Sequence, residues 1–239
     1  MSSSGKDIII GIGDAHFPFA DLSVISWIIN QIIIPNKKRI KAIVQVGDLF
    51  DMFSYAKFPK RLIMTPREET WLARAMAEEF WDQINRACPD SAKYQIKGNH
   101  DSRLMKRVVE TMPELDHLIK YDELFQFDGV EVIHDDKTDL IIDGWHFIHG
   151  HTKHGKHIEA VHFNNVCVGH SHRGGTVHMR LHQRKNPQLL TELNCGFIAD
   201  PHHEALVYRP LRKYFTWTQG VGVIDSHGGR FIPYKGDVK

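Results

Sequence analysis

The sequence predicts an α/β fold in which strands and helices alternate in the first half and short strands dominate the second half. Residues 7–46 read as strand, helix, strand, the pattern of a parallel strand pair with a right-handed crossover. After residue 125 the segments are short and β-like, and a mixed pattern of this kind suits one α/β domain. We find no repeat or linker, so we expect a single domain over residues 1–239.

Three strands are predicted in the first half, at residues 7–12, 40–46 and 92–96. The first is a continuous apolar run that breaks at glycine, as expected for a strand buried on both faces. Each of the three runs directly into a polar cluster, namely GDAH, GDLFD or GNHD.

The first helix is predicted over residues 21–34, where apolar residues recur at helical spacing. Asp21 is a suitable N-cap, and Pro35 is expected to stop the helix.

A longer helix is predicted over residues 66–87, because it starts at a proline, has an acidic first turn and closes before Pro89. Its tryptophans Trp71 and Trp81 are expected in the core or lining a groove. A further helix is predicted over about 101–111.

Short β-like segments make up the second half. They lie at residues 129–135, 139–143, 145–150, 165–170, 176–181, 189–194 and 215–225.

Composition limits the possible partners and the cellular compartment. The 30 basic and 29 acidic residues give a net charge of +1, so no bulk field points to nucleic acid or to an anionic membrane. The cysteines Cys88, Cys167 and Cys195 form no C-x-x-C pair and indicate reduced thiols. The apolar run near the N-terminus is too short for a signal peptide or a membrane span, so we expect a soluble cytoplasmic chain with no membrane partner.

Histidine is unusually frequent: the chain has 17, of which 11 lie between His134 and His182. Many could be ordinary loop residues, and each polar cluster taken alone could be a simple turn. As a group they follow predicted strands, and ligand sites in α/β sheets form at the carboxyl ends of strands. The clusters contain Asp14 and His16; Asp48 and Asp51; Asn99, His100 and Asp101; His149 and His151; and His170 and His172.

Carboxylate and amide oxygens mixed with imidazoles, without thiolates, suit catalytic manganese, iron or zinc better than a structural zinc site. Two such ions about 3.5 to 4 Å apart can clamp a phosphate and activate water for an in-line displacement. A carboxylate between them would serve both ions, and an uncoordinated histidine could protonate the departing alkoxide. The predicted chemistry is metal-assisted hydrolysis of a phosphate ester.

The five blocks DAH, GDLFD, GNHD, HGH and GHSH, in this order, resemble those of the calcineurin-like metallophosphoesterases. The resemblance implies a four-layer α-β-β-α sandwich of two mixed β-sheets flanked by helices. It also implies two divalent metal ions, for which manganese is the first choice and iron, zinc and nickel are alternatives.

Site residues follow from the same resemblance, block by block. His100 would be the general acid and Asp51 the carboxylate that orients it. In the HGH block the family ligand is usually the first histidine, so His149 is chosen over His151. The first metal would be held by Asp14, His16 and His172, the second by Asn99, His149 and His170, with Asp48 bridging both.

Departures from the protein serine/threonine phosphatases of this family point to another branch. Phe17, Met52 and Asp101 stand where those phosphatases have glycine, arginine and glutamate. The chain looks more like the phosphodiesterases and nucleases, and its C-terminal part loosely resembles small phage and prophage members.

Basic residues near the blocks are candidates for substrate contacts. Arg103 could bind a phosphate through its guanidinium fork, although a solvated helix start is an alternative; the other candidates are Arg173, Lys153 and Lys156. Lys106 and Arg107 are expected on solvated faces. A loop is expected at His134, Asp135 and Asp136, and sheet packing rather than base stacking for Phe215 and Trp217.

The sequence therefore predicts a dinuclear metal-dependent phosphodiesterase acting on nucleic acid or a nucleotide. Two alternatives stay open: a phosphomonoesterase, acting on nucleotides or proteins, and a non-catalytic binding scaffold of the same fold. The oligomeric state is not indicated.

Overall fold

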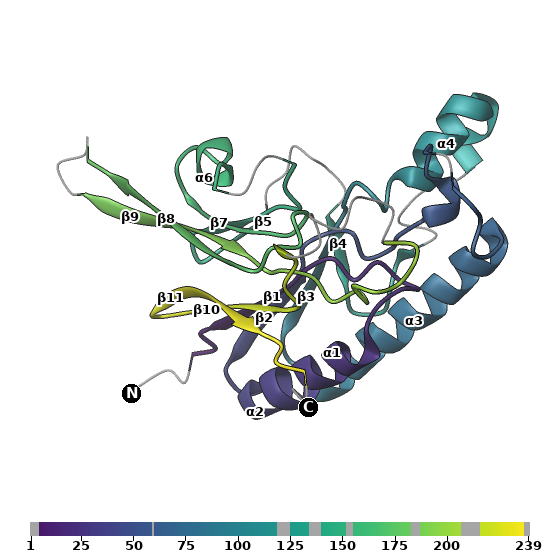
Figure 1. Cartoon of the computed structure of the whole chain (residues 1–239). Helices are drawn as coiled ribbons and strands as arrows, with labels where there is room; N and C mark the ends of the chain where they lie inside the picture. The colour runs from purple at the N-terminus through teal and green to yellow at the C-terminus, as the bar shows by residue number, and fades with distance from the viewer. Residues whose placement is uncertain are drawn as a thin grey trace.

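A computed structural model describes residues 5–58, 60–118, 125–133, 140–151, 155–182, 187–206 and 216–236. Two mixed β-sheets pack face to face, with helices on their outer sides (Figure 1). This arrangement confirms the four-layer fold that the resemblance implies. Within the described part of the chain, no helix combines the length and apolar character needed to cross a bilayer. The expectations for His134, Asp135, Asp136, Lys153 and Phe215 fall outside the described residues.

The first sheet has six strands. Strands β1 to β4 run parallel to one another, whereas β10 pairs antiparallel with β1 and β11 antiparallel with β10. The three strands predicted in the first half are confirmed. In sheet order the strands are β11 (Gly228–Pro233), β10 (Gly220–Asp225), β1 (Ile8–Ile12), β2 (Ile40–Gln45), β3 (Ala92–Ile96) and β4 (Glu131–Ile133).

The second sheet has five strands, all from the second half of the chain. Strands β6, β7 and β9 are parallel, and the two edge strands are antiparallel to their neighbours. In sheet order they are β5 (Leu140–Ile142), β6 (Trp145–Phe147), β7 (Asn165–Val168), β9 (Gln188–Asn194) and β8 (Gly175–Leu181).

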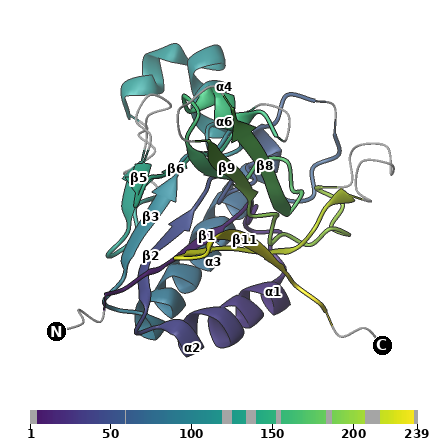
Figure 2. The same cartoon turned by 90° about the vertical axis from the view of Figure 1, so that its left-hand side faces the viewer.

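The helices cover the outer faces. Figures 1 and 2 show α1 (Leu22–Trp27), α2 (Ile34–Asn36) and α3 (Pro66–Ala87) on the face of the six-stranded sheet that points away from β8 and β9. The short α6 (His157–Ala160) lies over the five-stranded sheet, and α4 (Arg103–Thr111) follows β3. Two 3-10 helices, η2 (Phe53–Tyr55) and η3 (Pro113–Leu118), lie in the connections.

The first helix begins as predicted but ends later. Asp21 caps it by accepting a hydrogen bond from the Ser23 backbone N–H at 2.9 Å. Pro35 does not stop it at residue 34, because the chain stays helical to Asn36. The preceding turns, Ile28–Ile33, are π-helical, and this wider winding accommodates a proline in the last turn.

Helix α3 has the predicted ends. Thr65 caps it in a capping box with Glu68, in which each side chain accepts a hydrogen bond from the other residue's backbone N–H. Trp81 is buried, as predicted, but the expectation for Trp71 is wrong: it is 69% exposed. Trp71 lies on the outward face of a helix that buries one stripe only.

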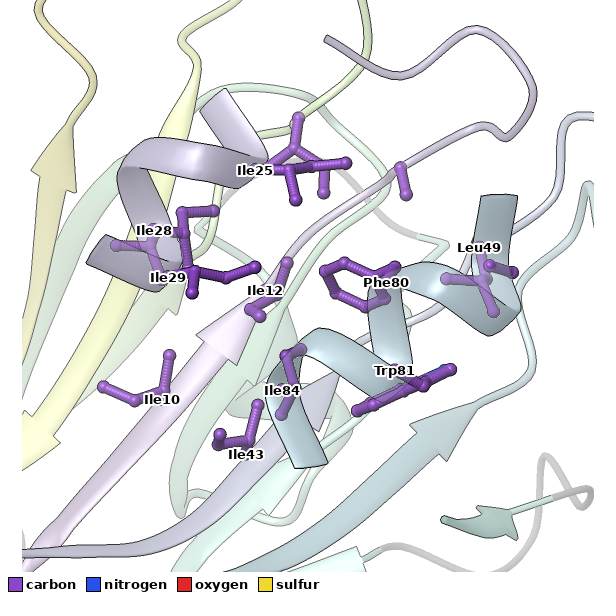
Figure 3. Packing of buried hydrophobic residues seen from close by; sticks show 14 of the residues in the cluster. Ile10, Ile12, Ile25, Ile28, Ile29, Ile43, Leu49, Phe80, Trp81 and Ile84 are labelled. Atoms are coloured by element: carbon purple, nitrogen blue, oxygen red, sulfur yellow. The ribbon is translucent and has the colours of Figure 1, made fainter. Parts of the chain in front are cut away.

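Apolar contacts fill the spaces between the layers. Figure 3 shows isoleucines of β1, β2 and the first helix packed against Phe80, Trp81 and Ile84 of α3. A second cluster, which includes Phe147 and Leu193, lies between the two sheets. The sheets are thereby held in fixed positions, and the loops at the carboxyl ends of β1, β2, β3, β6 and β7 meet at one edge.

Candidate metal centre

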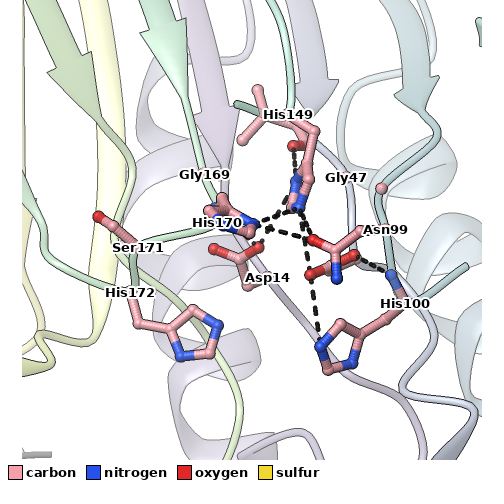
Figure 4. Close-up of polar contacts among 12 residues, drawn as sticks. Asp14, Gly47, Asn99, His100, His149, Gly169, His170, Ser171 and His172 are labelled. Carbon is pink, nitrogen blue, oxygen red and sulfur yellow. Dashed lines mark hydrogen bonds and ion pairs between the residues drawn. The ribbon is translucent and has the colours of Figure 1, made fainter. Parts of the chain in front are cut away.

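The five predicted polar clusters follow β1, β2, β3, β6 and β7, and side chains from the five clusters converge between the two sheets (Figure 4). Two groups of possible metal ligands form there, each with its donor atoms within 4.8 Å of one another. One group contains Asp14, His16 and His172, and the other contains Asp48, His149 and His170. These are the residue types and combinations predicted from the sequence; their metal-binding roles stay predictions.

Asn99 joins the second group. Its Oδ1 lies 3.0 Å from His149 Nε2 and 2.9 Å from His170 Nδ1. His149 Nε2 is also 3.2 Å from Asp48 Oδ2, while its Nδ1 donates to the backbone carbonyl of Val46 at 2.9 Å. Fixing one ring nitrogen on a carbonyl aims the other at the group, as in many metal-bound histidines.

The first group is held by its neighbours in a similar way. His16 Nε2 lies 3.1 Å from His172 Nε2, and the opposite nitrogen of His16, Nδ1, is 2.9 Å from Asp51 Oδ2. Asp14 Oδ1 accepts from the His170 backbone N–H at 3.0 Å, but the buried Oδ2 has no hydrogen-bond partner among the described residues. A buried carboxylate oxygen without a partner is costly, and a cation held here would satisfy it.

The electrostatics fit cation binding. Burial raises the pKa of Asp14 to about 7, although the nearby His149 lowers it. Burial lowers the pKa of His149, but the adjacent Asp48 outweighs burial and raises it to about 10. A proton on His149 thus balances the carboxylate charge, and a metal ion would take the place of that proton.

The imidazoles of His170 and His172 are kept neutral. Burial and the charge on His149 lower the pKa of His170 to about 4. Burial, together with His16, holds the pKa of His172 well below its ordinary value. Neutral imidazole is the form that coordinates metals.

A third possible group consists of His16, Asp51 and His100. His100 Nδ1 lies 3.3 Å from Asp51 Oδ2, and Arg103 Nη1 donates to Asp51 Oδ1 at 3.0 Å. Burial opposes ionisation of Asp51, but His100 and His16 outweigh it and lower its pKa. Because Arg103 already supplies a positive charge here, this group suits a metal ion less well than the other two.

Arg103 also contacts the predicted general acid. Its Nη2 donates to His100 Nε2 at 2.9 Å, and the Arg103 side chain is only 16% exposed. His100 itself is buried, and its backbone N–H donates to Asp48 Oδ1 at 2.7 Å. The predicted acid, its orienting carboxylate and the predicted phosphate contact therefore form one network beside Asp48.

Unusual backbone geometry places several of these side chains. His16, Asp48, His170 and His172 all have positive φ, at 50°, 53°, 66° and 59°. Such values are uncommon for residues other than glycine and concentrate at functional sites.

Two residues that hold the loops in place, Asp101 and Asn194, have no role predicted from the sequence. Asp101 is fully buried, and its carboxylate accepts from the backbone N–H groups of Phe50 at 2.8 Å and Gly98 at 2.7 Å, which ties the second loop to the third. The Asn194 amide donates to Gly169 O at 3.0 Å and to Ser171 Oγ at 2.8 Å, and so positions the GHSH block. Asp101 could have been found as the fourth residue of GNHD; for Asn194 the only signal is its place at a strand end.

Some sequence candidates lie outside the cluster. His151 is exposed, in contrast to the buried His149. Lys156 is exposed too, at the start of α6. The Arg173 guanidinium is exposed and makes no hydrogen bond or ion pair with the part of the chain that is described. Of the basic candidates that the structure describes, Arg103 contacts the network.

Comparison with known families agrees with this geometry. The profile of the calcineurin-like phosphoesterase family matches residues 8–189, which include all five blocks. No individual curated protein gives a match. The family match and the buried histidine and aspartate groups support a metal-dependent phosphoesterase. The chain therefore belongs to the calcineurin-like phosphoesterase family.

Proposed function

We propose that this protein is a dinuclear metal-dependent phosphodiesterase that acts on nucleic acid or nucleotides. The main support is that two groups of metal donors adjoin each other, with His100 beside them and outside both groups. A degenerate binding scaffold of this family would be expected to lose donors, and none is lost here.

Each metal has a complete set of candidate ligands. Manganese is the first choice, and iron, zinc and nickel are alternatives, because the donors are oxygens and imidazoles without thiolate. When bound, two such ions supply a positive clamp for the phosphate and activate the attacking water. Asp14, His16 and His172 would hold one ion, Asn99, His149 and His170 the other, with Asp48 shared.

His100 would give a proton from Nε2 to the departing oxygen. Asp51, 3.3 Å from the opposite ring nitrogen, would fix the orientation of the imidazole. In the structure Arg103 Nη2 lies 2.9 Å from Nε2, so the guanidinium occupies the side of the ring that would face the departing oxygen. Arg103 must turn away before His100 can act as an acid, and its guanidinium could then bind a phosphate of the substrate.

The choice of a diester over a monoester rests on the branch of the family. Phe17, Met52 and Asp101 differ from the residues of the protein phosphatases at the same positions, which favours the phosphodiesterase and nuclease branch. A phage or prophage type stays a prediction.

The test compares variants reconstituted with Mn²⁺ on bis(p-nitrophenyl) phosphate, a diester, and on p-nitrophenyl phosphate, a monoester. We expect the wild type to prefer the diester. His100→Ala should lower turnover by about 10² to 10⁴ while its metal content, measured by mass spectrometry, stays near wild type. Asp48→Ala should lose metal and activity together. His151→Ala is the matched control, because it changes an exposed histidine close to His149 in the sequence.

Three results would count against the proposal. Absence of metal-dependent turnover on both esters would remove the enzymatic function. A preference for the monoester would favour the phosphomonoesterase alternative. Equal turnover of His100→Ala and wild type would remove the general-acid role for the ester tested.

A further inference from the structure

A group of three cationic side chains lies next to His100, and only one of them, Arg103, has a role in the chemistry described so far. It consists of Arg103, Arg107 and Lys60, hereafter the basic triad. Arg103 contacts His100 and Asp51, and Arg107 lies one helical turn further along α4, on the same face. Lys60 comes from the connection after η2 and lies within electrostatic range of both arginines.

The Lys60 ammonium contacts groups of its own loop. It lies 5.4 Å from the ring centroids of both Phe53 and Phe58 and donates to the Ala56 carbonyl. Cation–π contacts of this kind orient an ammonium group at modest energy. The connection is also joined to α4, since Lys57 forms an ion pair with Glu110.

The positive charges of the triad are poorly balanced. Among the described residues neither Lys60 nor Arg107 forms an ion pair with a carboxylate, and the one carboxylate on Arg103, Asp51, is shared with His16 and His100. Burial and then repulsion from Arg103 lower the pKa of Lys60, and Arg107 adds to that repulsion, whereas the carboxylates of Glu69 and Asp51 raise it. Both carboxylates already accept hydrogen bonds from other groups, so an anion would further stabilise the three cations.

The position of the triad indicates which anion. Arg103 Nη2 lies 2.9 Å from His100 Nε2, the nitrogen that would give up the proton, and Asp48 Oδ2 lies 4.0 Å from the same nitrogen, so the triad adjoins the place where the leaving group would depart. A guanidinium pair with a lysine is a common phosphate-binding combination.

We propose that the basic triad binds a second phosphate of the substrate, on the leaving-group side of His100. This inference rests on the proposed function and makes it narrower: the substrate is a phosphodiester whose leaving alcohol carries a further phosphate, as in a nucleic-acid strand. Arg107, which is exposed as expected from the sequence, thereby acquires a role.

The kinetic test uses the Mn²⁺-loaded protein and four thymidine substrates. The dinucleotide TpT has no further phosphate, pTpT and TpTp carry one at either end, and TpTpT carries it as an internal diester. We expect one of the two phosphorylated dinucleotides to exceed TpT in kcat/KM by about tenfold. If the natural ligand is a nucleic-acid strand, TpTpT should also exceed TpT in kcat/KM. An increase in kcat/KM confined to the dinucleotides with a terminal phosphate would indicate that the natural ligand carries its second phosphate as a terminal monoester.

Two variants and one control decide whether the triad is responsible. Lys60→Met and Arg107→Met should each reduce the ratio of kcat/KM between phosphorylated and plain dinucleotide towards one. Lys38→Met removes the same charge at the opposite end of β2, from an exposed turn, and should keep the wild-type ratio. A wild-type ratio near one, or a ratio unaffected by both triad variants, would overturn the inference.

A binding measurement keeps this result separate from the proposed function. Calorimetry compares thymidine 3′,5′-bisphosphate with thymidine 5′-monophosphate and thymidine 3′-monophosphate, and needs no turnover. We expect the bisphosphate to bind the wild type about tenfold more tightly than either monophosphate, and to lose this advantage in both triad variants. Loss of turnover on bis(p-nitrophenyl) phosphate would remove the proposed function, whereas equal binding of bisphosphate and monophosphates would remove the second-phosphate site.

Discussion

At Gly98 a single methyl group would displace the residue expected to bridge the two metals. A Cβ there would lie 2.2 Å from both the backbone nitrogen and Oδ1 of Asp48. The same Oδ1 accepts the His100 N–H at 2.7 Å, so the second and third loops interlock at this point. Glycine is required because the two backbones approach so closely.

Gly98→Ala should therefore weaken metal binding by about ten- to a hundredfold, the range seen when the support of a ligand is lost. Titration of the metal-free protein with Mn²⁺ measures the effect. Gly236→Ala is the control, since a Cβ there would make only an ordinary contact, 3.4 Å from the Tyr234 ring. Unchanged affinity in Gly98→Ala would mean that Asp48 tolerates the displacement or does not bind metal.

The residue types of the site could be predicted from the sequence, because Asp14, His16 and the GHSH histidines follow strands whose carboxyl ends meet. The contact between Arg103 and His100 could not. It depends on where α4 starts: Asp101 and Ser102 remain outside the helix, and Arg103 becomes its first residue. Nothing in the local sequence fixes that start to within one residue.

At the level of elements, α3 shows how local signals define a helix. The capping box of Thr65 and Glu68 satisfies backbone donors that the first turn leaves free. The helix begins directly after the loop that carries Lys60, and Glu69 in its first turn accepts from the backbone N–H groups of Phe53 and Ser54. The start of α3 thus supports the connection around η2.

Thr65→Ala should lower the free energy of unfolding by about 1 kcal/mol, because it leaves a helix-terminal N–H without its acceptor. Urea unfolding followed by circular dichroism measures this. Thr65→Ser keeps the hydroxyl and should stay within about 0.5 kcal/mol of wild type. Equal losses in the two variants would show that the methyl group of threonine, rather than its hydroxyl, stabilises this helix start.

Other elements were less predictable for identifiable reasons. The sequence of β11, GGRFIP, has no continuous apolar run, and apolar and polar residues alternate only weakly in it. Its first three residues are two glycines and an arginine, all exposed or partly exposed. The helix that continues past Pro35 depends on π-helical turns, which no local pattern announces. Trp71 follows helical spacing poorly, and tertiary packing alone determines which face of α3 is covered.

At the level of the whole molecule, the candidate ligands come from both sheets. Asp14, His16, Asp48 and Asn99 follow strands of the six-stranded sheet, whereas His149, His170 and His172 follow strands of the five-stranded one. An ion held by ligands of both kinds would connect the two sheets. The unfolded chain offers no such arrangement, so metal binding and folding are linked.

Adding Mn²⁺ at a hundredfold excess over its Kd should stabilise the protein by about 2.7 kcal/mol. For a domain of this size that corresponds to a rise in Tm of about 5 to 10 °C. Differential scanning calorimetry of metal-free and loaded protein measures it, and Asp48→Ala should show a much smaller rise. A rise of equal size in Asp48→Ala would place the stabilising ion elsewhere.

The origin of the ligands in two sheets also bears on when the chain can become active during synthesis. The ribosome synthesises Asp14, Asp48 and Asn99 early. The histidines that would complete their ligand sets are all present only once the chain has been synthesised past His172. Until then the emerging polypeptide holds an incomplete set of candidate ligands. The full set therefore becomes available late in synthesis, and a chain that ends before His172 lacks part of it.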